Sequence, residues 1–278
     1  MRESELHGRM PGLAQLCSFK YKCQVMKLQL LRNATQVLVM NGKTILIDPM
    51  LAPKGSYDAF QQTGNDTRNP LVDLPIQELE LTQLLEQVDA VLLTHVHLDH
   101  WDKVAQERLP KDIVLLCQPA NAEQIRQSGF TQVRPIDTVV DWEGIRISRT
   151  GGRHGTGEVG QRMGIVSGYV LEEGDDRLYI AGDTIWCEEV QEAIDQYQPS
   201  HIVVNGGGAR FVAGDPIVMD IYDIFTVCAY APAARIHVVH LEAVNHGKER
   251  RADIKAALRA RGYDGHCVVP RDGEWFIQ

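Results

Sequence analysis

Length and charge limit the classes of protein to which this chain can belong. With 278 residues, it is long enough to bury a sizeable core as one large α/β domain or as two smaller ones, and we favour one domain. A formal charge of -9 argues against general nucleic-acid binding, which requires a basic face. The sequence contains no apolar run long enough to span a bilayer, so no membrane partner is expected.

The cysteines and the N-terminal residues contain no targeting or disulfide pattern. Residues 1–25 are aperiodic and lack the apolar core of a secretory signal, so we expect a poorly ordered N-terminal extension before a domain over 26–278. The cysteines are scattered without a Cys-x-x-Cys pair, which predicts reduced thiols in a cytoplasmic protein. They are Cys17, Cys23, Cys117, Cys187, Cys228 and Cys267.

The expected domain opens as an antiparallel meander. Residues 27–31, 36–40 and 43–47 form short strand-like runs. The dipeptide Asn41-Gly42 between the last two runs is a strong signal for a hairpin.

A long loop and a helix follow the meander. Residues 49–75 are rich in Pro, Gly, Asn and Asp and show no period, which predicts a loop that either covers a functional cleft or is an inert excursion. Residues 76–88 carry one apolar helical face and lead into a buried strand that ends at Leu93.

Three imidazoles and two carboxylates crowd into the nine residues after this strand. His95 and His97 project to the same side of an extended backbone, because side chains there alternate, so both could bind one ion. If a helix covers 98–109, Asp99 and His100 lie in its first turn, away from its apolar stripe, and could bind a second ion. Imidazole and carboxylate are ordinary ligands of zinc and related divalent metals.

The pattern His-x-His-x-Asp-His after a hydrophobic strand resembles the signature of the metallo-β-lactamase superfamily of metal-dependent hydrolases. The resemblance implies an α/β fold, a four-layer αββα sandwich of two mixed β-sheets flanked by helices. Residues 26–278 further resemble the branch related to L-ascorbate-6-phosphate lactonase. Asn33 stands where many of those relatives carry Gly-His-Ala. Asp48, in a strand-Asp-Pro pattern, either supports the metal site from outside the ligand sphere or is a plain turn carboxylate.

Two further ligands are implied after later strands. The strand over 145–148 runs into a glycine-rich loop with His154, which the resemblance makes the third histidine of the first metal site. The strand over 177–181 is followed by Asp183, at the place of the carboxylate that bridges two metals. The side chain of Asp183 or of Thr184 could also cap the N-terminus of the helix expected after them.

The last ligand is implied near the strand over 235–240. His240, at the strand end, is our choice, while His246 is either the ligand instead or a nearby proton donor. His237 lies deeper in the strand and is expected to be structural. The loop 206–210 contains three glycines and Arg210, which predicts a tight turn or an oxyanion site.

The resemblance therefore implies a binuclear site. The expected metal ligands are His95, His97 and His154 for one ion, Asp99, His100 and His240 for the other, and Asp183 between them. Two ions roughly 3.5–4 Å apart can hold a bridging water and lower its pKa toward about 7. Zinc is the expected metal and manganese the alternative.

The expected reaction is hydrolysis by metal-bound hydroxide, without a covalent enzyme intermediate. Asp99 is expected to orient the nucleophile, and His246 to protonate the leaving group. The expected substrate is a small ester, lactone or phosphorylated lactone, so an anionic molecule is allowed. The alternatives are a phosphodiesterase of the same fold and a non-catalytic binding protein. Di-iron relatives with redox activity carry glutamate where this chain has His97, so hydrolysis is expected rather than redox chemistry. The sequence also allows a homo-oligomer.

Overall fold

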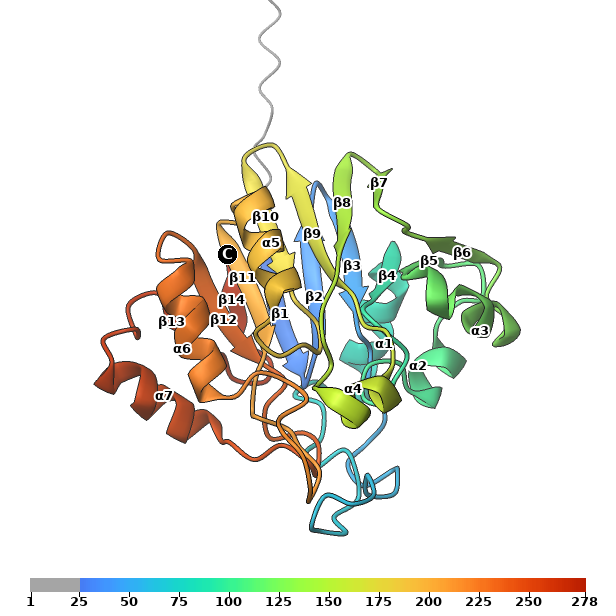
Figure 1. The fold of residues 1–278 in the computed structure, drawn as a ribbon. Coiled ribbons are helices and arrows are strands. Elements are labelled where there is room, and N and C mark those ends of the chain that lie inside the picture. Colours follow the sequence, from blue (N-terminus) through green and yellow to red (C-terminus); the bar gives the residue numbers. More distant parts are fainter. Residues whose placement is uncertain (1–25) are drawn as a thin grey trace, which may run out of the picture.

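The structure is a computed structural model that describes residues 26–278 (Figure 1). The extension expected over 1–25 lies outside the described residues. Within the described part, two seven-stranded sheets face each other and helices cover their outer faces. None of the helices in this part is long and apolar enough to cross a membrane.

The first sheet has the order β14-β1-β2-β3-β4-β5-β6. Its strands are β1 (Lys27–Arg32), β2 (Thr35–Met40), β3 (Lys43–Ile47), β4 (Ala90–Leu93), β5 (Val114–Cys117), β6 (Gln132–Pro135) and β14 (Trp275–Ile277). The expected meander is confirmed, since β1, β2 and β3 pair antiparallel. Asn41 and Gly42 both have positive φ, at 48° and 71°, as a tight hairpin turn requires. Strands β3 to β6 pair parallel.

The second sheet has the order β13-β12-β11-β10-β9-β8-β7. Its strands are β7 (Val139–Trp142), β8 (Ile145–Thr150), β9 (Gly168–Glu173), β10 (Asp176–Ile180), β11 (His201–Asn205), β12 (Arg235–Val239) and β13 (Cys267–Val268). Strands β7 to β10 pair antiparallel, and β10 to β13 pair parallel. Both sheets are therefore mixed.

Three apolar layers hold the sandwich together. The helices are α1 (Glu78–Gln87), α2 (Lys103–Arg108), α3 (Ala122–Gln127), α4 (Gly157–Met163), α5 (Glu188–Tyr197), α6 (Ile221–Tyr230) and α7 (Arg251–Ala260), with a 3₁₀ turn at Pro119–Asn121. On β4, Ala90 and Leu92 pack between the sheets, whereas Val91 and Leu93 pack under the first three helices. Helices α5, α6 and α7 cover the second sheet. The four-layer αββα sandwich is confirmed.

Several element boundaries differ from those expected. The helix expected over 98–109 begins only at Lys103, because Asp102 caps it by accepting a hydrogen bond from the amide of Ala105 at 2.7 Å. Residues 98–101 form a turn instead. Thr184 does not cap α5, which begins after Cys187; its hydroxyl accepts from the amide of Arg153 at 2.9 Å.

Three elements were not expected from the sequence. Strand β6 and helix α4 are short and lack a clear apolar period. Strand β13 has only two residues, and β14 follows it. This strand returns to pair antiparallel with β1.

The long loop 49–75 is attached to the body of the protein by a buried arginine. Arg32 is fully buried, and its guanidinium donates to the carbonyls of Met50 (2.7 Å), Ala52 (2.9 Å) and Val72 (2.9 Å). Both ends of the loop are thereby held near β1. In Figure 1 the loop lies at the lower end of the sandwich, which is also the end at which the ligand-type residues follow their strands.

Candidate metal centre

The ligand-type residues come from four strand ends at one edge of the sandwich. His95 follows β4, His154 follows β8, Asp183 follows β10 and His240 directly follows β12. All four are buried, with no more than 3% of the surface of each exposed. The edge is shared by both sheets, so the site forms only when the sheets are packed together.

The carboxylate of Asp183 lies at the centre of this site. Its Oδ2 is 3.2 Å from His100 Nε2, 3.5 Å from His154 Nε2 and 3.9 Å from His95 Nε2. Its Oδ1 is 3.8 Å from His240 Nε2. One carboxylate therefore faces histidines that the sequence analysis assigned to two different ions.

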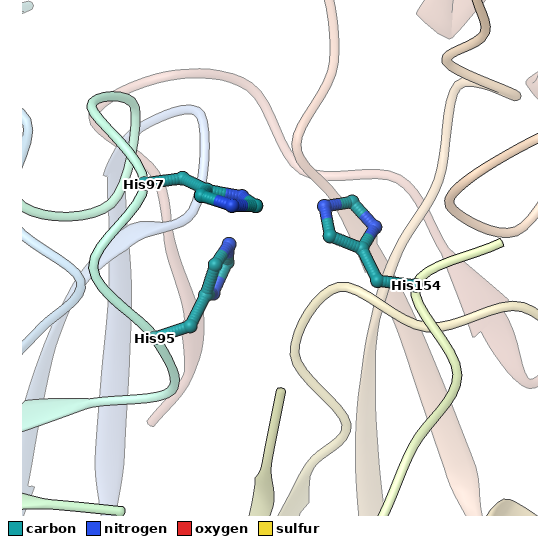
Figure 2. Close-up of side chains that lie close together, drawn as sticks. All are labelled: His95, His97 and His154. Carbon is teal, nitrogen blue, oxygen red and sulfur yellow. The ribbon is translucent and has the colours of Figure 1, made fainter. Parts of the chain in front are cut away.

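The donor atoms form two groups around Asp183. His95, His97 and His154 have ring nitrogens within 4.8 Å of one another, and Figure 2 shows His154 facing the other two rings from the opposite side. The second group, again within 4.8 Å, consists of Asp99, His100, Asp183 and His240. Within it, Asp99 Oδ2 lies 3.1 Å from His240 Nε2. All seven residues singled out in the sequence are thus brought together.

Asp48 links a histidine from each of the two groups, on the side of the rings that faces away from Asp183. Its Oδ2 accepts a hydrogen bond from His100 Nδ1 at 2.8 Å and from the Thr94 hydroxyl at 2.6 Å. The same hydroxyl lies 3.0 Å from His95 Nδ1 and can accept its proton. With Nδ1 of both rings engaged in this way, both Nε2 atoms face Asp183. Asp48 has the supporting contacts that a second layer around a metal site needs.

The remaining groups are held by backbone or amide contacts. His154 Nδ1 donates to the carbonyl of Ile217 at 2.7 Å, and the Asn205 amide donates to Asp183 Oδ1 at 2.6 Å. The amide of Asn33 donates to the Asp99 carbonyl at 3.1 Å, and the carbonyl of Asn33 accepts from the His240 amide at 2.9 Å. Asn33 therefore holds backbone on both sides of the site.

Backbone strain is concentrated at the same place. Asp48, Asn33 and His240 have φ values of 43°, 57° and 64°, in the left-handed region that residues other than glycine seldom adopt. Such conformations persist where the surrounding contacts over-determine them.

Burial and charge set the protonation of the ligand-type groups. Burial lowers the pKa of His95, His97 and His154, so these rings are neutral and can offer a lone pair. Burial alone would raise the pKa of Asp99 and of Asp183, but the neighbouring His100 outweighs it and both carboxyls have a pKa well below the ordinary range.

His100 shows that the site carries more negative than positive charge. Burial alone would lower its pKa, yet the carboxylates of Asp183, Asp99 and Asp48 raise that pKa well above the ordinary value. In addition, His95 Nε2 and His100 Nε2 are buried without a hydrogen-bond partner. Buried polar nitrogens seldom remain without a partner, and excess negative charge calls for a cation. The residues present therefore fit metal ions.

A cavity of about 410 Å³ opens directly onto the two groups of ligand-type residues. His97, Asp99, His154 and Asp183 line its floor. The walls contain Phe60, Gln61 and Gln62 from the long loop, Leu98 from the turn before α2, Arg162 and Met163 from α4, and Phe211 and His246 from the second half of the chain. The long loop thus covers the cleft, as one of the two interpretations of its sequence proposed.

His246 lines the cavity and is not a member of the two groups of ligand-type residues. Its ring centroid is 6.5 Å from that of His240, and Phe60 packs edge-on against it at 4.9 Å. Burial lowers its pKa to about 4, so the ring is neutral, and its Nδ1 has no partner. His237 lies away from the site, between the sheets, where its Nε2 is 3.1 Å from His201 Nδ1.

Three of the five backbone amides over 206–210, the glycine-rich loop after β11, donate to carbonyls of the protein. Gly206 donates to the carbonyl of Val239, Gly208 to that of Met219 and Arg210 to that of His246. The loop is therefore a tight turn that supports the site, and the oxyanion-binding alternative has no support.

Sequence reasoning missed several residues of the site and its cavity. Thr94, Asn205, Phe60, Arg162 and Phe211 were not singled out, although Thr94 and Asn205 stand beside or at strand ends that were recognised. Phe60, Arg162 and Phe211 lie on loops or on a short helix without a period, so no pattern in the sequence marks them.

Comparisons with known proteins agree with this geometry. A family model for the beta-lactamase superfamily domain matches residues 43–241. The UPF0173 protein YddR of Bacillus subtilis is 41% identical over 90% of this chain and 98% of its own length. A UPF0173 metal-dependent hydrolase of Thermococcus onnurineus is 26% identical over 63% of this chain and 70% of its own.

Solved structures extend the likeness. A protein described as a possible metal-dependent hydrolase of Veillonella parvula has a TM-score of 0.87 and 36% identity, covering 91% of this chain and 100% of its own. An isothiocyanate hydrolase from Delia radicum gut bacteria has a TM-score of 0.86 and 36% identity, covering 91% of this chain and 99% of its own. With a family model that spans most of the chain and relatives this similar over nearly their whole length, the chain belongs to the beta-lactamase superfamily of metal-dependent hydrolases.

Proposed function

We propose that this chain is a hydrolase with a binuclear metal centre. The proposed ligands are His95, His97 and His154 at one position, and Asp99, His100 and His240 at the other, with Asp183 shared. The observation that carries the proposal is the Asp183 carboxylate, whose oxygens lie within 3.9 Å of histidine nitrogens from both groups. Two divalent ions would supply an activated water and polarise the bond under attack. Zinc is the first metal to test and manganese the second.

The protein's own groups would position the reactants. Asp48 and Thr94 hold His95 and His100 with their Nε2 atoms toward Asp183. We assign to Asp99 the orientation of the attacking water, because its carboxylate is charged and faces the cavity. We assign to His246 a hydrogen bond to the leaving atom, because its neutral ring can donate one proton into the cavity.

We propose isothiocyanates as the substrate class. The cavity has apolar walls of Phe60, Leu98, Met163 and Phe211 above a polar floor, which suits a small molecule with an apolar tail and an electrophilic head. A protein that is 36% identical over nearly its whole length is named an isothiocyanate hydrolase. Water would add to the central carbon of R–N=C=S, and cleavage of the carbon–nitrogen bond would give the amine R–NH₂ and carbonyl sulfide.

A lactone, ester or phosphorylated lactone is the second candidate, and Arg162 favours an anionic one. Arg162 is the one arginine or lysine among the cavity-lining residues. Its guanidinium lies 5.9 Å from the centroid of the Phe211 ring. A phosphate or carboxylate on the substrate could pair with this guanidinium.

A metal-reconstituted substrate screen tests both candidates. Protein stripped with a chelator and reloaded with zinc or manganese would be assayed with isothiocyanates, lactones, phosphorylated lactones and phosphodiesters. We expect about two equivalents of metal and turnover of isothiocyanates that Asp183→Ala abolishes. The exposed Asp195→Asn is the control, since its carboxylate contacts only Tyr230. Bound metal below about half an equivalent would exclude the binuclear centre.

The remaining proposals concern the domain boundary and the cellular compartment of the enzyme. We propose that 26–278 fold as one domain and act in the cytoplasm on a small molecule. Cys117, Cys187, Cys228 and Cys267 are free and buried, which suits a reducing compartment. Circular dichroism and activity of a chain that begins at Met26 would test the domain boundary.

A further inference from the structure

Arg32 holds the two ends of the loop that covers the cavity, and the buried side chain of Asn245 binds its middle. Asn245 is 4% exposed. Its Oδ1 accepts from the amide of Phe60 at 3.0 Å and from Asn69 Nδ2 at 2.9 Å. Its Nδ2 donates to the carbonyl of Phe60 at 3.2 Å and to the Thr63 hydroxyl at 2.7 Å. One amide therefore holds both the amide and the carbonyl of Phe60.

The backbone of Asn245 adds two further bonds to the same loop. Its amide donates to Asn69 Oδ1 at 2.8 Å, and its carbonyl accepts from Asn65 Nδ2 at 2.8 Å. Asn69 and Asn245 therefore bind each other reciprocally, although they are 176 positions apart in the chain. Every hydrogen-bonding group of Asn245 is directed at this loop.

The residue fastened in this way forms a wall of the substrate cavity. Phe60 packs edge-on against His246, with ring centroids 4.9 Å apart and an angle of 88°. His246 is held independently, because its carbonyl accepts from the amide of Arg210 at 3.2 Å. The carbonyls of Gln62 and Thr63 are held separately, by the Val212 amide at 2.7 Å and by Lys248 Nζ at 2.8 Å. Removing the Asn245 side chain should therefore loosen Phe60 itself and leave the backbone of His246 anchored.

The packing of Phe60 is confined to the neighbourhood of the cavity. Phe60 packs with Met50, Val72, Ala243 and Val244 in a small cluster that is separate from the three large apolar layers. Loss of the fastening should therefore open this wall without unpacking the sheets or the metal-binding groups.

We propose that Asn245 is a positioning residue that fixes Phe60 against His246 and so sets the preference of the enzyme for substrates with a bulky apolar tail. The kinetic part of this proposal rests on the proposed isothiocyanate hydrolysis. Phe60 supplies apolar surface for the tail, whereas the small electrophilic head is handled at the floor. Tail preference and head chemistry are therefore separable.

Kinetics on two substrates provide the first test. Methyl and phenethyl isothiocyanate share the reacting group and differ in the tail, so the ratio of their kcat/KM values measures tail preference. We expect Asn245→Ala and Phe60→Ala each to lower the phenethyl-to-methyl ratio about tenfold, mainly through KM, with metal content unchanged. Because Asn245 acts through Phe60, the double variant should lower it no further. Additive losses, or an unchanged ratio in Asn245→Ala, would overturn the proposal.

Hydrogen exchange provides a test that needs no substrate. In Asn245→Ala, amides in 56–70 should exchange about tenfold faster, while those of β4 stay protected. Arg68→Ala is the matched control, because Arg68 binds Gly55, Ser56 and Asp58 within the same loop and does not contact Asn245. The Arg68→Ala variant should leave the phenethyl-to-methyl ratio of kcat/KM values unchanged. Unaltered exchange over 56–70 in Asn245→Ala would refute the fastening, whereas a wild-type enzyme inactive on isothiocyanates would refute only the substrate class.

Discussion

Asp48 and His100 form a buried pair in which the carboxylate accepts a hydrogen bond from the ring Nδ1 at 2.8 Å. The same carboxylate oxygen accepts from Thr94, whose hydroxyl contacts His95. One acidic side chain thus fixes the ring orientation of one histidine from each group of ligand-type residues. The predictions below begin with this pair.

Removing the Asp48 carboxylate should weaken metal binding more than it weakens the fold. Asp48→Ala leaves His100 Nδ1 and the Thr94 hydroxyl without their acceptor, so both rings lose their fixed orientation. We expect metal affinity to fall about 10–100-fold, measured by competition with a chromogenic chelator. Asp195→Asn serves as the control. If Asp48→Ala bound metal with the affinity of the wild type, Asp48 would be a turn residue without a role in metal binding.

His240 and His246 should be separable by metal content. His240→Ala removes a nitrogen 3.8 Å from Asp183 and should cost about one equivalent of bound metal. His246→Ala should keep the metal and lower kcat by about 10²-fold, because a hydrogen bond to the leaving atom is lost. Elemental analysis beside kinetics distinguishes the two. Metal loss in His246→Ala with full loading in His240→Ala would reverse the assignment.

His237 should make the fold sensitive to acid. Burial lowers the pKa of His237 to about 3, below the value of 6.5 expected in the unfolded chain, so its contribution to stability is lost as pH falls from about 6.5 toward 3. At pH 5 the loss relative to pH 7 is about 2 kcal/mol. Urea unfolding of apo protein at both pH values should show a smaller difference in His237→Gln. His266→Gln, at a half-buried position, is the control. If the free energy of unfolding depended on pH equally in the wild type and in His237→Gln, protonation of His237 would not be the cause of the acid sensitivity.

Arg32 should be important for stability although it lies behind the site. Arg32→Ala leaves the carbonyls of Met50, Ala52 and Val72 without their donor in a buried place. We expect the free energy of unfolding to fall by about 3 kcal/mol or more, measured by urea denaturation. The exposed Arg271→Ala should change it by less than about 0.5 kcal/mol. A similarly small effect in Arg32→Ala would mean that water replaces the guanidinium.

The sequence predicts best what depends on short-range patterns. The meander was readable from Asn41-Gly42, because that turn determines its own neighbourhood. The two groups of ligand-type residues could be expected because each member follows a strand, and parallel strands end at one edge of a sheet. The assignment of those residues as ligands was drawn from a resemblance and stays a prediction.

What escaped the sequence depends on long-range contacts. The start of α2 at Lys103 is set by Asp102, whose carboxylate also accepts from the amides of Leu51 and Ala52, far back in the chain. Phe60 reaches the cavity through Asn245, which no local pattern could connect to it. Strand β14 is three residues long, and only its pairing with β1 makes it a strand.

The return of β14 to the edge of β1 has a consequence for how the protein is made. Residues 275–277 pair with residues near the start of the fold, so the first sheet lacks its outermost strand until translation has passed Ile277. Strand β1 therefore emerges from the ribosome with an unpaired edge, a surface on which nascent chains aggregate. Completion of the first sheet should accordingly wait until residues 275–277 are available, and chaperone dependence should concentrate in that interval.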